Sequence, residues 1–192
     1  MFAPRTVAVV VGSLRRDSLT RQLAQAFAAL APDLDFVFVG IGDLPHFDED
    51  LEANPPEAWL RFRRDVAVAD AVLFATPEYN RSIPGVLKNA IDVGSRPYGH
   101  SVWRGKPGAV ISVSPGGIGG FGANHHLRQC MVFLNMPTLA EEAYVGGAGG
   151  LFDANGQLAS EATIAFLRAY AMAFTGWIEL ILGDTEGVPE PV

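Results

Sequence analysis

The sequence has almost no cysteine: Cys130 is the single one among 192 residues. One thiol cannot form a disulfide within the chain, so we expect a protein of a reducing compartment, with a cytoplasmic location. Cys130 opens the apolar run 130–134, which is typical of a buried structural thiol and not of an exposed nucleophile.

An excess of basic residues is also missing. The chain has 14 Lys and Arg against 21 Asp and Glu, a formal net charge of -7, and its basic residues are scattered along the sequence. Proteins bind nucleic acids through clustered basic side chains, so we expect no nucleic-acid partner.

Long apolar runs are lacking as well. The stretch 171–182 is interrupted by Gly176 and Glu179, and it is shorter than the roughly 20 residues that cross a bilayer. Strand-like sequence begins at Thr6, so we expect no signal peptide. The sequence therefore predicts no membrane span.

Several catalytic signatures are absent. The sequence contains neither a G-x-S-x-G nucleophile motif nor a Gly-Lys-Ser/Thr phosphate loop. No two histidines have i, i+4 spacing, and the adjacent His125 and His126 would point about 100° apart on a helix. We therefore predict no metal site, no catalytic nucleophile and no ATP or GTP chemistry.

What the sequence does contain is a regular alternation of strands and amphipathic helices. Strands are predicted from continuous apolar or β-branched runs, and helices from apolar residues at helical spacing. The predicted strands are 6–11, 35–40, 71–76, 107–113 and a short fifth one at 137–140. The predicted helices are 18–31, one that ends near 70, one that begins at 84, 119–134 and 160–175.

This order of elements predicts an α/β fold, a three-layer, doubly wound sheet of five parallel strands that is flavodoxin-like. We expect residues 1–192 to form a single domain with a frayed tail at 183–192. Ligands of such sheets bind at the carboxyl ends of the strands. The loops after the first, third and fourth strands are therefore the candidate binding loops.

The first of these loops combines hydroxyls with two guanidinium groups just ahead of a helix. Ser13, Ser18 and Thr20 supply the hydroxyls, and Arg15 and Arg16 supply the charges. Helix N-termini and guanidinium groups attract phosphate, and the three oxygens of a phosphate monoester need several donors at once. The pattern favours an anion site for a group such as the FMN phosphate, and a surface loop with Ser18 as an ordinary N-cap is the alternative.

The second loop follows the third predicted strand and lies between Pro77 and Pro84. A flat heteroaromatic ring needs a face on which to stack and donors and acceptors in its plane. Tyr79, Asn80 and the loop backbone can supply both. The alternative is that the prolines only delimit a loop and that Tyr79 is a packing aromatic.

The third loop follows the fourth predicted strand and is rich in glycine. Gly117, Gly119 and Gly122 match the dinucleotide fingerprint G-x-G-x-x-G, and Glu141 or Glu142 lies where a ribose-binding acid is expected, about 20 residues on. However, only one short strand is predicted beyond this loop, so the βαβαβ half that such a fingerprint opens is missing. We favour glycines that let the backbone approach a flat ring.

As an ordered set, the three loops resemble the NADPH-dependent FMN reductase family. The likeness covers about residues 6–175 and rests on Gly12-Ser13-Leu14-Arg15 with Ser18 and Arg21, on Thr76-Pro77-Glu78-Tyr79-Asn80 with 82–85 and 87–92, and on Gly105-Lys106-Pro107. The family, which includes bacterial quinone and chromate reductases and some azoreductases, implies a flavodoxin-like fold and bound FMN. It also implies a homodimer or homotetramer with the flavin near a subunit boundary.

The resemblance assigns roles to residues of each loop. The implied phosphate ligands are Ser13, Arg15, Ser18 and Thr20. Relatives usually carry Asn at the position of Thr20. The residues implied to border the flavin ring are Pro77, Glu78, Tyr79, Asn80 and Arg81. Those implied to close its other side are Ser114, Gly116, Gly117 and Gly119.

The implied reaction is hydride transfer from NADPH or NADH to FMN, followed by electron transfer to a small acceptor such as a quinone, a flavin, an azo compound or chromate. The cofactor carries this chemistry, so no catalytic side chain is predicted. Two alternatives remain at this point. One is a flavodoxin-type FMN electron carrier without nicotinamide reactivity, and the other is an NAD-binding protein that uses 117–122.

Overall fold

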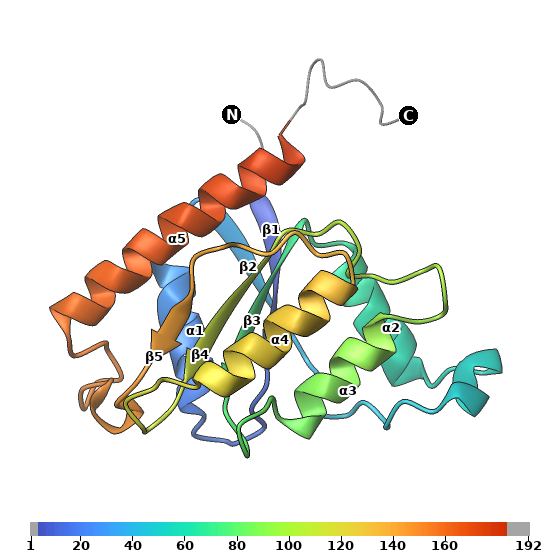
Figure 1. Cartoon of the computed structure of the whole chain (residues 1–192), viewed down its shortest axis with the longest axis horizontal. Coiled ribbons are helices and arrows are strands. Elements are labelled where there is room, and N and C mark those ends of the chain that lie inside the picture. Colours follow the sequence, from blue (N-terminus) through green and yellow to red (C-terminus); the bar gives the residue numbers. More distant parts are fainter. Residues whose placement is uncertain (1–3, 184–192) are drawn as a thin grey trace.

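The computed structural model describes residues 4–183, in which one parallel sheet carries helices on both faces (Figure 1). The strands are β1 (Arg5–Val11), β2 (Leu34–Val39), β3 (Ala71–Pro77), β4 (Gly108–Val113) and β5 (Ala143–Val145). Their order in the sheet is β2-β1-β3-β4-β5, with every neighbouring pair parallel. This is the flavodoxin-like order, so the predicted fold class is confirmed. Except for Gly183, the predicted frayed tail lies outside the described residues.

The central strands are continuous apolar runs because both of their faces are covered. In β1, Val7 and Val9 belong to one hydrophobic cluster, while Ala8 and Val10 belong to the other, and all four are fully buried. Successive side chains of a strand point to opposite faces, which explains this division. The first face is covered by α1 (Leu19–Ala29) and α5 (Glu161–Leu182). The second is covered by α2 (Glu57–Ala67), α3 (Gly85–Gly94) and α4 (Phe121–Phe133).

The prediction of a fifth strand at 137–140 is wrong. Thr138 makes only an isolated bridge to the start of β4. The ladder stops there because the groups that would continue it have other partners. The Arg128 guanidinium binds the carbonyl oxygens of Leu139 and Glu141, and the Tyr170 hydroxyl bonds to the N–H and the carbonyl of Val110. The actual β5 lies further along the chain and pairs with the carboxyl-terminal half of β4.

The last helix is longer than predicted. Ser160 is its N-cap, as the expected start at 160 implies. However, α5 continues beyond Thr175 to Leu182. Gly176 does not end the helix because Phe174 and Ile178, on either side of it, are buried in the core, and this packing outweighs the helix-weakening effect of a glycine.

By length and composition alone, α5 could cross a membrane. Its most apolar 18-residue window has a mean hydropathy of 1.4, and 28% of that window is buried. Its buried side chains pack on the sheet, while Phe166, Met172 and Leu180 are exposed. The core helix of a soluble protein passes the same test, so the absence of a membrane span stays a prediction.

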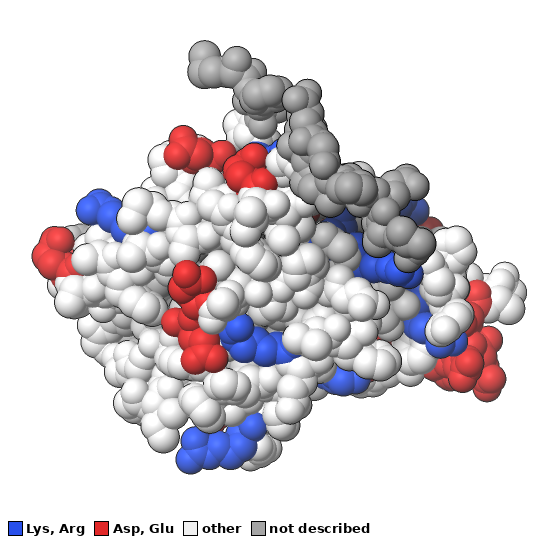
Figure 2. Space-filling view, turned by 45° about the horizontal axis from the view of Figure 1, so that its top comes forward, with Lys and Arg blue, Asp and Glu red and all other residues white. Residues whose placement is uncertain are grey.

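Charged side chains are interspersed on the surface. On the face drawn in Figure 2, Lys and Arg side chains lie at several separate places, some of them beside Asp and Glu side chains. A nucleic-acid backbone requires a continuous basic patch or stripe. No such patch is visible on this face, and the absence of a nucleic-acid partner stays a prediction.

Candidate functional site

The switch point of the sheet lies between β1 and β3. The chain runs from β1 to the sheet edge at β2, and from β3 to β4 in the other direction. In such sheets a crevice forms at the carboxyl ends of the two strands. The first loop begins in this crevice. It is tied to β3 because the backbone N–H of Gly12 donates to the carbonyl of Ala75 at 2.8 Å.

A pocket of about 190 Å³ at this point gathers residues from all three predicted loops. It is lined by Ser13, Arg15, Ser18, Leu19, Thr20, Pro77, Glu78, Tyr79, Val113, Ser114, Pro115 and Ala148. The structure thus brings together all four predicted phosphate ligands, three predicted residues of the second loop and one predicted residue of the third, Ser114. The remaining predicted residues belong to the same loops but do not line the pocket: Asn80, Arg81, Gly116, Gly117 and Gly119.

The hydroxyls of the first loop are buried although they are polar. Ser13, Ser18 and Thr20 are only 7%, 2% and 3% exposed, respectively. Ser18 is the N-cap of α1, and its Oγ accepts the backbone N–H of Arg21 at 3.1 Å. The N-cap interpretation is therefore correct for its side chain, yet the same hydroxyl keeps a proton to donate into the pocket. Arg15 adds an exposed positive charge at the rim.

The Glu78 carboxylate is directed at the start of α4. Its Oε2 accepts the backbone N–H groups of Gly122 and Ala123 at 2.7 and 3.2 Å, and its Oε1 accepts from Arg81 at 3.2 Å. The N-cap residue of α4 is Gly120, with φ of 81°, and it has no side chain to cap the helix. Glu78 supplies the missing cap from another loop, where the helix dipole also favours a negative charge. This contact fixes the second loop against α4.

The tip of the second loop is a tight two-residue turn. Tyr79 and Ser82 exchange two backbone hydrogen bonds, of 2.9 and 3.0 Å. Between them, Asn80 and Arg81 both have positive φ, 51° and 64°, as in a type I′ turn. Asn tolerates this conformation, but for Arg it costs on the order of 1 kcal/mol. The ion pair of Arg81 with Glu78 and the close approach of its carbonyl to α4 hold it there.

The dinucleotide fingerprint of the third loop does not have its usual setting. Within residues 4–183 the sheet continues beyond β4 only by β5, so no second βαβαβ half is built. The N-terminus of α4, where a pyrophosphate would bind, already carries the Glu78 carboxylate. The backbone explains instead why position 119 needs a glycine. Its φ is 65°, and an added Cβ would lie 2.8 Å from the backbone of β5.

Four residues of the pocket wall were missed by the sequence reasoning. Leu19, Val113 and Pro115 are chain neighbours of predicted residues, so their proximity could have been inferred. Ala148 has no sequence signal. Its backbone N–H donates to the Ser114 carbonyl at 3.2 Å, which brings this distant segment to the end of β4.

The paired histidines have separate partners. The Nε2 of His125 shares a hydrogen bond of 2.9 Å with the Tyr144 hydroxyl, and the Nδ1 of His126 shares one of 2.8 Å with the Ser82 hydroxyl. Burial raises the pKa of Tyr144 to about 12, so this hydroxyl keeps its proton at neutral pH. Among the described residues no cluster of side chains suited to a metal ion is found.

The chain matches proteins of known family over most of its length. The model of the family described as "NADPH-dependent FMN reductase" matches residues 5–150. The chain belongs to this family. The resemblance inferred from the three loops is confirmed, and the matched region contains every predicted binding residue.

Two curated proteins are similar to this chain in sequence. A quinone reductase of Pseudomonas putida is 60% identical over 178 residues, which are 91% of this chain and 95% of the relative. A 2-hydroxy-1,4-benzoquinone reductase of a Burkholderia species is 48% identical over 174 residues, 90% of this chain and 95% of the relative. The solved structure of the flavoenzyme NAD(P)H:(acceptor) oxidoreductase FerB from Paracoccus denitrificans has a TM-score of 0.87 at 45% identity, and the match covers 92% of this chain and 98% of FerB.

Proposed function

We propose that this member of the FMN reductase family is an NAD(P)H-dependent quinone reductase that holds FMN in the pocket at the switch point. One observation carries the proposal. A hydroxyl-rich loop at a helix N-terminus and a stiff loop with an exposed aromatic side chain meet in one pocket, in a chain 60% identical to a quinone reductase. FMN needs both kinds of site, one for its phosphate and one for its ring.

The residues present fit FMN. The hydroxyls of Ser13, Ser18 and Thr20, the Arg15 guanidinium and the free N–H groups at the start of α1 would hold the phosphate. At about 190 Å³ the pocket is smaller than the roughly 300 Å³ at which small-molecule sites begin. It therefore suits the phosphate end, with the ring at the rim, where Tyr79 is half exposed.

When bound, FMN supplies the hydride-accepting and electron-passing chemistry. The protein contributes binding and orientation. The type I′ turn and the Glu78 contact keep the second loop in one conformation, so its backbone presents fixed donors and acceptors. An open rim lets a nicotinamide and then a quinone reach the same place in turn.

The two rival functions have less support. The curated relatives at 60% and 48% identity are both named as reductases, which disfavours a carrier without nicotinamide reactivity. The Glu78 carboxylate at the N-terminus of α4 would repel a pyrophosphate, which disfavours NAD binding at 117–122.

Anaerobic stopped-flow mixing tests the proposed reaction. We expect the protein to purify yellow, its flavin band to bleach on mixing with NADPH or NADH, and the band to return when a benzoquinone is added. Riboflavin, which lacks the phosphate, should bind the apoprotein at least about tenfold more weakly than FMN. A yellow protein that resists both nicotinamides would show a carrier, and a colourless one that binds NAD would show the dinucleotide function.

We further infer that a second copy of the chain covers the outer face of α4. Phe121 and Val132 lie on one face of this helix, and Phe133, which is 85% exposed, lines the same surface groove as Val132. Large apolar side chains gathered on a surface are characteristic of interaction sites. Because α4 begins at the Glu78 contact, a copy bound there would lie near the pocket.

Substitution of Phe133 tests this interface. We expect light scattering to show an oligomer for the natural sequence and a smaller species for Phe133→Glu, because a buried carboxylate would be left without a partner. The matched control is Val68→Glu, a change at another highly exposed apolar residue, just beyond α2. A monomeric natural protein, or an equal effect of both substitutions, would contradict the assignment.

A further inference from the structure

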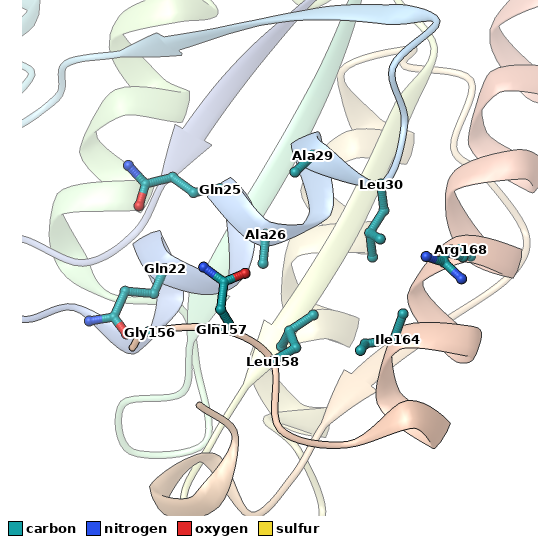
Figure 3. A pocket seen from close by; sticks show the side chains of 10 residues that line it. All are labelled: Gln22, Gln25, Ala26, Ala29, Leu30, Gly156, Gln157, Leu158, Ile164 and Arg168. Atoms are coloured by element: carbon teal, nitrogen blue, oxygen red, sulfur yellow. The ribbon is translucent and has the colours of Figure 1, made fainter. Parts of the chain in front are cut away.

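A second cavity, of about 540 Å³, lies between α1 and α5 and shares no residue with the flavin pocket (Figure 3). It is lined by Gln22, Gln25, Ala26, Ala29, Leu30, Gly156, Gln157, Leu158, Ile164 and Arg168. These residues come from α1 and its C-cap, Leu30, from α5, and from the segment between η2 (Ala148–Gly150) and α5. None of the proposed oxidoreductase chemistry uses them.

One wall of this groove is a preformed hairpin. Phe152 and Leu158 form an antiparallel bridge, and the backbone N–H of Asp153 donates to the Gln157 carbonyl at 2.8 Å. The Asp153 carboxylate accepts the backbone N–H groups of Asn155 and Gln157 at 2.8 and 2.9 Å, which also lowers its pKa. The turn is thus tied together by its own hydrogen bonds, and the groove does not depend on a ligand for its shape.

The middle of the groove is apolar. The small side chains of Ala26 and Ala29 form its α1 side, and Leu158 and Ile164 lie across from them (Figure 3). Alanines on a helix leave room for a flat or extended hydrocarbon body between α1 and α5. Burial of such a body between these side chains would be favourable at about 25 cal/mol per Å² of apolar surface.

The two ends of the groove are polar in different ways. The amides of Gln22, Gln25 and Gln157 gather at one end, and the Arg168 guanidinium lies at the other (Figure 3). Among the described residues, none of these four side chains has a hydrogen bond or ion pair with another side chain or the backbone. No acid lines the groove, although the chain has 21 acids against 14 basic residues. The groove is therefore complementary to an anion at the Arg168 end.

We propose that this groove binds an elongated organic acid. Its carboxylate would pair with Arg168, its apolar body would lie against Ala26 and Ala29, and a hydroxyl or carbonyl at its far end would bond to the glutamine amides. Cations are disfavoured because no acidic side chain is available. The proposal concerns a second binding site and is independent of the flavin chemistry.

Calorimetric titration of the flavin-loaded protein with 6-hydroxy-2-naphthoic acid tests the site. This probe carries a carboxylate and a hydroxyl at opposite ends of a flat apolar body. We expect saturable binding of one probe per chain and a loss of about tenfold or more in Arg168→Ala, as befits a charge-assisted hydrogen bond. Ala26→Trp, which fills the middle of the groove, should abolish binding.

Two controls separate this site from others. Arg104→Ala removes an exposed arginine outside the groove and should leave the affinity unchanged, and 2-naphthol, which lacks the carboxylate, should bind equally weakly to the natural protein and to Arg168→Ala. Arg168 is exposed, so its removal does not threaten the fold. The proposal is wrong if the natural protein does not bind the acid, if Arg168→Ala binds it equally well, or if a benzoquinone displaces it.

Discussion

Arg15→Ala should weaken FMN binding by about 10- to 150-fold. Arg15 lines the proposed FMN pocket at its rim, beside three buried hydroxyls that carry no charge. A guanidinium that binds a phosphate contributes about 1.5–3 kcal/mol as a charge-assisted hydrogen bond, and this range corresponds to the fold-change given. The affinity is measured by titrating the apoprotein with FMN and monitoring the quenching of flavin fluorescence.

The neighbouring Arg16 is the matched control for this prediction. It is an exposed arginine of the same loop but does not line the pocket, so Arg16→Ala should change FMN affinity only slightly, through the loss of one unit of nearby charge. Equal losses in the two variants would mean that the loop acts only through its net charge. Unchanged affinity in Arg15→Ala would remove the phosphate site from the first loop.

Gly122→Ala should lower both stability and FMN affinity. The added Cβ would lie 2.7 Å from the Arg81 carbonyl oxygen and 3.0 Å from the Glu78 carboxylate, so either the turn or the helix cap must move. Forcing a methyl group into a packed site costs about 1–3 kcal/mol. We expect a loss of this size in the free energy of unfolding by urea, together with weaker flavin binding, because the displaced loop borders the pocket.

A glycine in a similar helical position controls for the change of residue type. Gly85 is the first residue of α3, and an added Cβ there would meet nothing within 4 Å. Gly85→Ala should leave FMN affinity unchanged and raise stability by up to about 1 kcal/mol, because it restricts the unfolded chain. If Gly122→Ala behaved in the same way, the Glu78 contact with α4 would not fix the second loop.

The sheet was predictable wherever a strand is buried on both faces. Runs such as 6–11 and 71–76 are long, β-branched or apolar, and they stand out from any helical pattern. β5 escaped prediction because it has only three residues, and its position depends on pairing with β4 and on Arg128, which occupies the carbonyls of the preceding segment. Tertiary contacts therefore decide which segment pairs with β4.

The candidate site was predictable loop by loop but not contact by contact. The carboxyl-end rule and the composition of the loops located Ser13, Arg15 and Tyr79, which do share a pocket. The sequence could not show that the Glu78 carboxylate caps a helix 44 residues further along the chain, since this depends on how two loops meet. It could not place Ala148 in the pocket for the same reason.

Because a side chain of another loop caps α4, the opening of that loop can be followed by amide hydrogen exchange. The amide protons of Gly122 and Ala123 are protected by Glu78 only while the second loop is in place. The rate at which these protons exchange with deuterium therefore reports how often that loop opens. If FMN binds in the adjacent pocket as proposed, a loop that opens rarely would retain it as a prosthetic group, and a loop that opens often would release it as a product. The exchange rate of these two amide protons would then distinguish the two cases.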